Sequence, residues 1–233
     1  MRAKFLIIIA FILSNSWASF SQTMVNGEPY LSQGKIVFDV AYPDAQPSGK
    51  AAASIPAGKV VYFKNDKMRI ETKMADGHTE IQLIDFTNKI EHSLKEVSEK
   101  KYAVKTTPDD VQKECTKIPY VEVRNADEFK SIAGSNCQKN QYMITDKNHD
   151  TFTCDIYTNF KVLIINPNWF YPQFREVAHF MYEYSIKQNG VVAKVTAKSV
   201  EQFNEDESIF NIPSGYKPVT KVEFAKLKHK SAD

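Results

Sequence analysis

The five histidines are the first candidates for catalytic chemistry, because imidazole exchanges protons near neutral pH. None of them belongs to an H-E-x-x-H motif, and the chain contains no G-x-S-x-G and no phosphate-binding glycine loop. A hydrolase would need His92 or His179 beside a carboxylate, and the spacing predicts no such pair. We therefore expect no catalytic residue and no enzyme. The five are His78, His92, His149, His179 and His229.

One segment approaches a calcium-binding pattern. Residues 146–150 read D-K-N-H-D, which matches the first half of a calcium loop. Such a loop then requires glycine at its sixth position and glutamate at its twelfth. This chain has Thr151 and Tyr157 there. Because Asn and Asp favour turns, the segment predicts a polar hairpin turn and no metal site.

Three cysteines, Cys115, Cys137 and Cys154, could form one disulfide and leave one thiol. Any of the three pairings is compatible with the sequence. The chain has no C-x-x-C motif and no Cys/His cluster, so we expect neither a metal nor another cofactor.

The most distinctive apolar segment is residues 162–174 (VLIINPNWFYPQF), called the aromatic loop below. It has no charged residue, and its two prolines prevent a regular helix or strand. Such a loop must bury itself, which predicts contact with the concave face of a sheet. It could complete the core as a plug, or it could be a lid over an apolar ligand cavity. The candidate ligand-binding residues are Leu163, Ile165, Trp169, Phe170, Tyr171 and Phe174.

The first 21 residues have the order of a secretory signal peptide. Arg2 and Lys4 precede an apolar run over residues 5–13, followed by small residues that allow cleavage after Ala18 or Ser21. An uncleaved anchor or a buried first strand is the alternative. The run is short for a bilayer span, and no cysteine follows it for lipid attachment. We expect export to the periplasm or beyond the cell, without a transmembrane segment in the mature chain.

The net charge is +2 and the chain has no basic block, which argues against nucleic-acid binding. Residues 22–233 are numerous enough for one domain with a single core. Strands of β-branched and aromatic residues are expected at 35–42, 59–64, 67–75 and 79–86. Residues 43–58, rich in Ala, Pro, Ser and Gly, predict a mobile loop.

Three dipeptides predict tight hairpin turns: Asn65-Asp66, Asp76-Gly77 and Asn189-Gly190. The first turn pairs Phe63 with Met68, and the second would pair Ile70 with Leu83. Further strands are expected up to residue 203, and a capping box at Thr220 predicts a helix over 220–228. Sequential hairpins imply a mainly β fold: one curved antiparallel meander, a half-barrel with one or two short helices.

Three segments resemble a family of uncharacterised exported proteins of Gram-negative bacteria. They are residues 62–71 (YFKNDKMRIE), 130–137 (KSIAGSNC) and 210–217 (FNIPSGYK), which match K-x-I-A-G-x-x-C and F-x-I-P-x-G-Y in the second and third. The family is more distantly similar to periplasmic lipoprotein carriers of the LolA/LolB type. This resemblance implies a curved antiparallel sheet with helices closing an apolar cavity, and it implies no catalytic residue.

The leading hypothesis is a non-enzymatic envelope protein that binds a lipid or another apolar ligand under the aromatic loop. The alternative is an interaction or sensor module that recognises an envelope protein and has no small-molecule ligand.

Overall fold

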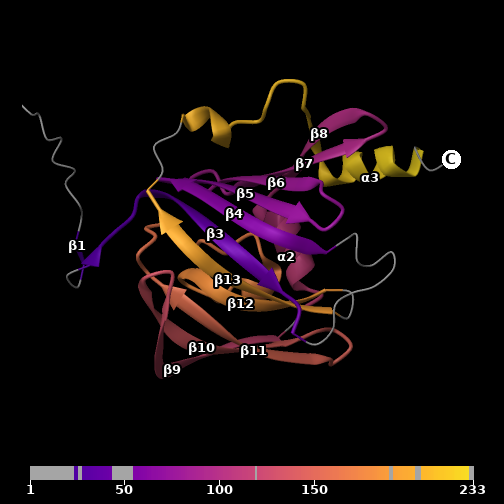
Figure 1. The fold of residues 1–233 in the computed structure, drawn as a ribbon. Coiled ribbons are helices and arrows are strands. Elements are labelled where there is room, and N and C mark those ends of the chain that lie inside the picture. The colour runs from indigo at the N-terminus through magenta and orange to yellow at the C-terminus, as the bar shows by residue number, and fades with distance from the viewer. Residues whose placement is uncertain are drawn as a thin grey trace, which may run out of the picture.

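The computed structural model describes residues 24–25, 28–43, 55–118, 120–188, 191–202 and 206–230. The expected signal peptide (residues 1–21), most of the expected mobile loop (44–54) and the Asn189-Gly190 turn lie outside these residues. Twelve strands form one curled sheet, and two short helices accompany it in the described part of the chain (Figure 1). The predicted mainly β fold is confirmed.

The large sheet consists of two meanders. Its spatial order is β14-β8-β7-β6-β5-β4-β3-β13-β12-β11-β10-β9, and every pair is antiparallel except β14 with β8. The meanders join where β3 pairs with β13. A separate two-stranded sheet holds β1 (Met24–Val25) and β2 (Glu28–Pro29). The twelve strands are β3 (Gln33–Ala41), β4 (Pro56–Lys64), β5 (Lys67–Met74), β6 (Thr79–Asp85), β7 (Ile90–Val97), β8 (Lys100–Thr106), β9 (Tyr120–Ile132), β10 (Ser135–Thr145), β11 (Thr151–Asn159), β12 (Phe180–Gln188), β13 (Val191–Glu201) and β14 (Lys217–Thr220).

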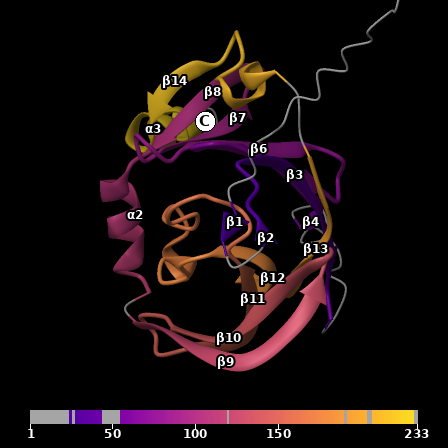
Figure 2. The same cartoon turned by 90° about the vertical axis from the view of Figure 1, so that its left-hand side faces the viewer.

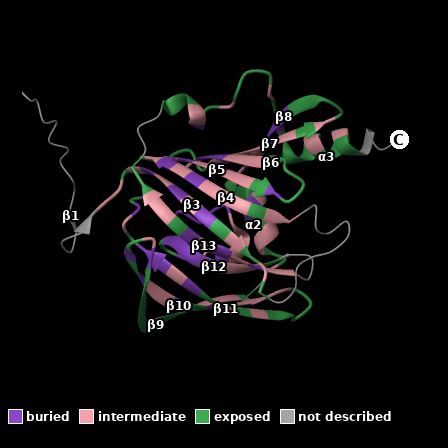
Figure 3. Cartoon of the chain, viewed as in Figure 1, coloured by how far each residue is buried: buried purple, intermediate pink, exposed green. Residues whose placement is uncertain are grey.

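The hairpin of β4 and β5 follows the sequence prediction. Phe63 pairs with Met68 and Val61 pairs with Ile70, and all four side chains are buried on one face. Asn65 adopts φ 53°, the left-handed conformation that a two-residue turn requires. Figure 3 shows the resulting alternation of buried and exposed residues along the strands. β4 begins at Pro56, so residues 56–58 are strand rather than loop.

The second hairpin corrects the predicted register. β5 ends at Met74 and β6 begins at Thr79, so four residues form the turn instead of two. The backbone N–H of Gly77 donates to Met74 O (3.0 Å), and the Asp76 side chain accepts from the N–H of His78 (3.1 Å). Ile70 therefore pairs with Gln82, and Leu83 pairs with Arg69. A shift of one residue turns Leu83 to the convex face, where it packs with Leu94 and Ala103.

The sheet curls around its concave face, and α2 (Pro108–Cys115) lies across the open side (Figure 2). Thr107 and Asp110 form the capping box that starts this helix. From α2, Val111 is buried in the core and Cys115 packs against it partly buried. None of the described helices has the length and apolar character needed to cross a bilayer.

The C-terminal elements pack at the β14–β8 end of the sheet. The helix α3 (Lys221–Lys230) follows β14, and Thr220 and Glu223 form the capping box at its start. Phe224 of α3 packs edge-on against Tyr102 of β8 at 5.8 Å between ring centroids. The same elements cover the end of the sheet opposite to β9.

Candidate functional site

The aromatic loop lies inside the half-barrel, between the two meanders. At its start, Leu31 forms a parallel bridge with Val162, and the N–H of Leu31 donates to Lys161 O (2.7 Å). In its middle, the buried Asn168 amide donates to Val177 O (2.9 Å) and His179 O (3.0 Å). The short helix η1 (Pro172–Phe174) ends it. The segment is therefore a folded part of the interior, although it has no strand.

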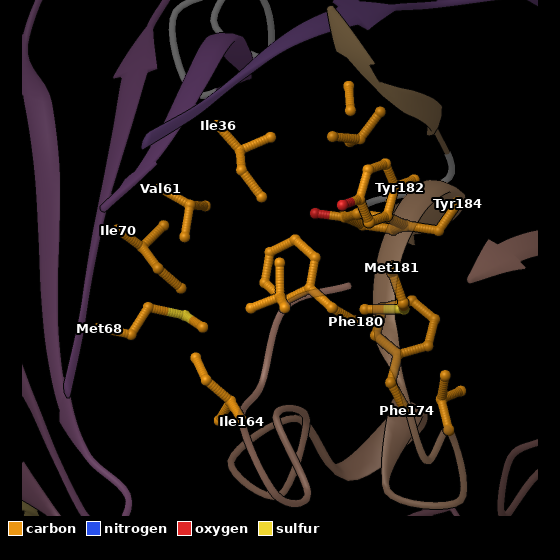
Figure 4. Close-up of a cluster of buried hydrophobic side chains, with 14 of the residues drawn as sticks. Ile36, Val61, Met68, Ile70, Ile164, Phe174, Phe180, Met181, Tyr182 and Tyr184 are labelled. Atoms are coloured by element: carbon orange, nitrogen blue, oxygen red, sulfur yellow. The ribbon is translucent and has the colours of Figure 1, made fainter. Parts of the chain in front are cut away.

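Four of the six predicted ligand-binding residues come together in the core. Phe174 is only 1% exposed and packs against Tyr142 (5.6 Å between centroids) and Tyr184 (5.4 Å). The ring of Phe170 packs against that of Tyr171 in a tilted arrangement at 4.3 Å between centroids, and it meets Trp169 edge-on at 5.9 Å. Figure 4 shows how the walls around them oppose each other. Ile36, Val61, Met68 and Ile70 lie on one side, facing Phe180, Tyr182 and Tyr184 of β12.

The remaining space beneath Trp169 and Phe170 is very small. A void of about 20 Å³ lies between the loop and the sheet, lined by residues that include Val61, Ile70 and Phe170. This volume is enough for one water molecule and far below the several hundred Å³ of a ligand pocket. In this structure the loop is a plug that completes the core. The interpretation as a lid over an open cavity does not describe this state.

The other two predicted residues face away from the core. Leu163 is 53% exposed and Ile165 is 91% exposed. Together with Trp169 and Phe86 they line an open groove of about 600 Å³ at one end of the aromatic loop. The loop therefore has an inner side built into the core and an outer side in contact with solvent.

A lysine that the sequence interpretation did not single out lies at the same place. Lys59 Nζ donates to the Tyr184 hydroxyl at 2.8 Å. It also lies 5.3–5.7 Å from the ring centroids of Phe38, Tyr171 and Tyr184, within cation–π distance. Burial raises the pKa of Tyr184 and of Tyr171, so both phenols stay neutral. Among the described residues, no carboxylate forms an ion pair with Lys59.

A signal for Lys59 was present in the sequence. Strand residues two apart share a face, so the pattern that buries Val61 and Phe63 also turns Lys59 toward the core. Glu91 of β7 is a buried carboxylate on the concave face that accepts hydrogen bonds from Gln82 and Ser93. Alternation does not mark it, because Ser93 and Lys95, which share its face of the strand, are polar. A charge that interrupts an apolar face is the feature that marks Lys59.

The predicted disulfide is wrong in this structure. None of the three cysteines is in a disulfide. Cys154 is opposite Tyr142 in the β10–β11 ladder, five residues along β10 from Cys137. At about 3.3 Å per residue the separation is about 16 Å, and a disulfide needs Cα atoms within about 7 Å. Cys115 ends α2. Burial raises the pKa of the Cys154 thiol to about 11, which keeps it protonated and unreactive.

Three buried polar atoms near the loop have no hydrogen-bond partner within the described part of the protein. They are Trp169 Nε1, Tyr142 Oη and Ser135 Oγ. An unsatisfied buried polar group costs about 1–3 kcal/mol, and native interiors contain few of them. The concave face therefore has unused hydrogen-bonding capacity beside its apolar lining.

The histidines and the calcium-like segment do not build a further site in the described chain. No hydrogen bond or ion pair joins His92 or His179 to a carboxylate there. Asp146 accepts from the N–H groups of Asn148 and Asp150, and His149 adopts φ 65° in the same turn. The described residues contain no cluster of three or more possible metal ligands.

Comparison with known proteins finds little sequence similarity. No protein-family model matches the chain, and no curated protein matches it. The resemblance to an exported family therefore rests on the short motifs alone. Among solved structures, the lipoprotein LppX of Mycobacterium tuberculosis is similar in fold, with 7% identity and a TM-score of 0.38. The match covers 75% of this chain and 89% of that chain. At this level of similarity it carries no information on what the chain binds.

Proposed function

We propose that this chain is a non-enzymatic binding protein of the cell envelope, which holds an apolar or lipidated ligand on the concave face of its half-barrel. The observation that carries the proposal is that one uncharged loop provides Trp169, Phe170, Tyr171 and Phe174 to the space between the two meanders. This loop is not a strand of the sheet. It can therefore leave without breaking a ladder between strands.

The ligand would exchange places with the inner side of the loop. Burying an apolar side chain contributes about 1.5–3 kcal/mol, and a buried methylene contributes about 0.8 kcal/mol. An acyl chain of about 12 methylenes would therefore replace most of the burial that four aromatic side chains lose. The partnerless Tyr142 Oη and Ser135 Oγ would remain for polar groups of the ligand or for water. Export to the envelope is inferred from the order of residues 1–21.

The proposal is tested on protein isolated from the envelope without detergent. Native mass spectrometry should find an apolar molecule bound to part of the population. The delipidated chain should then take up a fluorescent fatty acid. A chain that starts at Gln22 contains Trp169 as its single tryptophan, because the other one is Trp17. The fluorescence emission of Trp169 should shift when the protein takes up the fatty acid. A clean mass of the protein alone, with no uptake of the fatty acid, would exclude the proposal.

A second candidate is an interaction or sensor module for an envelope protein. The exposed side chains of Leu163 and Ile165 beside the open groove favour it. Crosslinking in envelope extracts distinguishes the two functions. A photoreactive residue at position 165 would then crosslink one protein in a 1:1 ratio with this chain. That result, together with no bound lipid, would favour this candidate.

A further inference from the structure

The environment of Lys59 is unusual for a lysine on a strand. Its stem lies on the concave face with Phe38, opposite it on β3, and Thr72, opposite it on β5. Its ammonium group reaches Tyr184 of β12, although β3 and β13 lie between β4 and β12 in the sheet. The curl of the sheet makes this contact possible. The ammonium therefore lies at the boundary of the small void, which Lys59 and Tyr184 both line.

The ammonium retains hydrogen-bonding capacity. It has three N–H donors. One is used by the Tyr184 hydroxyl, and the Tyr171 hydroxyl also interacts with the ammonium. The Tyr184 hydroxyl accepts from Lys59, so its own proton can be donated to another group. Asn168, which lines the same void, uses its amide on Val177 and His179. The Lys59 ammonium and the Tyr184 hydroxyl are thus two adjacent hydrogen-bond donors at the edge of the small void.

The positive charge of the Lys59 ammonium has no ion-pair partner among the described residues. Two half-buried lysines nearby have a carboxylate partner: Lys64 of β4 pairs with Glu207, and Lys35 of β3 pairs with Glu201. Lys59 has aromatic rings instead. Another charged group of the concave face, Glu91, is on β7, three strands from β4 in the sheet. It acts on the Tyr171 hydroxyl, as Lys59 does, but no ion pair joins it to Lys59 among the described residues.

We infer that Lys59, with Tyr184, binds the carboxylate head of a long-chain fatty acid whose tail lies along Val61, Ile70 and Met68. This inference rests on the proposed function, since the tail occupies the space of the aromatic loop. The three apolar residues line the void that begins at Lys59. A carboxylate accepts well from both an ammonium and a phenol, and charge-assisted hydrogen bonds are the strong ones. A neutral amphiphile would gain the tail contacts alone.

The test compares oleate with oleyl alcohol, which has the same chain and a neutral head. Binding of each to the delipidated protein is measured by calorimetry for the wild type and for Lys59→Met, Lys59→Arg and Tyr184→Phe. Lys101→Met is the matched control, because Lys101 also lies over an aromatic ring, that of Tyr216 (5.8 Å), on the convex face. Each chain is first checked for native β structure by circular dichroism.

Wild type should bind oleate at least about tenfold more tightly than oleyl alcohol, as expected for hydrogen bonds to a charged group. Lys59→Met should reduce oleate affinity to that of the alcohol and leave alcohol affinity unchanged. Lys59→Arg should retain most of the preference, and Lys101→Met all of it. Equal affinities of wild type for the two ligands, or unchanged oleate binding by Lys59→Met, would overturn the role of Lys59 while the proposed function stands. If wild type binds neither ligand, the proposed function itself is wrong. The wild-type comparison needs no variant, so the inference is testable even if Lys59→Met does not fold.

Discussion

Two charged side chains, one on each face of the curled sheet, have opposite surroundings. On the convex face, Glu183 of β12 is 4% exposed, yet it accepts from Lys130 (3.0 Å) and Thr196 (3.1 Å) and pairs with Lys194 (3.0 Å). On the concave face, Lys59 has a phenol and three rings but no carboxylate in the described chain.

This difference suggests different roles for the two charges: Glu183 stabilises the fold, and Lys59 is available to bind another molecule. The buried charge of Glu183 is fully paired, whereas the half-buried ammonium of Lys59 has no ion-pair partner among the described residues and can still interact with another molecule. The partnerless hydroxyl groups of Tyr142 and Ser135 lie on β10 and are also buried. The convex face therefore has the features of a completed structure, and the concave face has those of a surface that receives something.

The largest expected effect comes from the concave core. Phe174→Ala removes a ring that is 1% exposed and packs between Tyr142 and Tyr184. The free energy of unfolding should fall by about 3–5 kcal/mol, because the cavity cannot fully collapse. Urea denaturation followed by circular dichroism measures it. The matched control is Ile165→Ala on the outer side of the same loop, with a change within about 0.5 kcal/mol. Equal effects of the two would refute the division of the loop into two sides.

Loosening the loop should separate stability from binding. Asn168→Ala removes both amide hydrogen bonds and leaves the carbonyls of Val177 and His179 without that donor. We expect a loss of about 2–3 kcal/mol of stability together with faster uptake of a fluorescent fatty acid, since the loop leaves more readily. Stopped-flow fluorescence gives the uptake rate. An unchanged or slower rate in a folded variant would mean that the loop does not gate binding.

Breaking the paired charge on the convex face should cost stability in a pH-dependent way. Burial alone raises the pKa of Glu183, but its hydrogen bonds and charge contacts with Lys130 and Lys194 outweigh burial and lower it. A carboxyl with a lowered folded-state pKa stabilises the protein above its unfolded pKa of about 4.3. This contribution is lost as the pH falls through the folded-state pKa.

Glu183→Gln should therefore reduce stability by about 2 kcal/mol at pH 7. The difference from wild type should shrink as the pH is lowered below about 4. Chemical denaturation at several pH values measures this. A difference that stays constant from pH 7 to acid would show that the charge of Glu183 contributes nothing.

The smallest effect is expected for the unpaired charge. Lys59→Met should change the stability of the ligand-free protein by less than about 1 kcal/mol, because it breaks no ion pair and the methionine keeps the apolar contacts of the stem. Thermal denaturation measures the change. A loss as large as that of Glu183→Gln would make Lys59 a structural residue and would remove the contrast between the two faces.

The fold could be read from the sequence wherever local signals act alone. Alternation and the Asn65-Asp66 turn were sufficient to pair Phe63 with Met68. The Asp76-Gly77 signal failed because the chain closes that hairpin with a four-residue turn, a choice that a dipeptide does not determine. The pairing of β3 with β13 was also out of reach, since it joins strands far apart in the chain.

The site was predictable in part for a similar reason. The composition of residues 162–174 predicts that the segment is buried, as Phe174 is. It does not predict which residues face the core and which face solvent, and Ile165 faces solvent. Lys59 was overlooked because its importance depends on Tyr184, which reaches it through the curl of the sheet. The disulfide prediction rests on the number of cysteines alone, which says nothing about their positions in the fold. The register of β10 with β11 keeps Cys137 and Cys154 apart.

The central claim is that a ligand replaces the inner side of the aromatic loop, and hydrogen–deuterium exchange of residues 162–177 tests it most directly. In the structure, the N–H groups of Tyr171, Phe174 and Val177 donate to Asn168 O, Tyr171 O and Phe174 O. On saturation with oleate, exchange at these amides should become faster while the amides of β4 and β12 stay protected. Oleate bound without any change in the exchange of this segment would contradict the account.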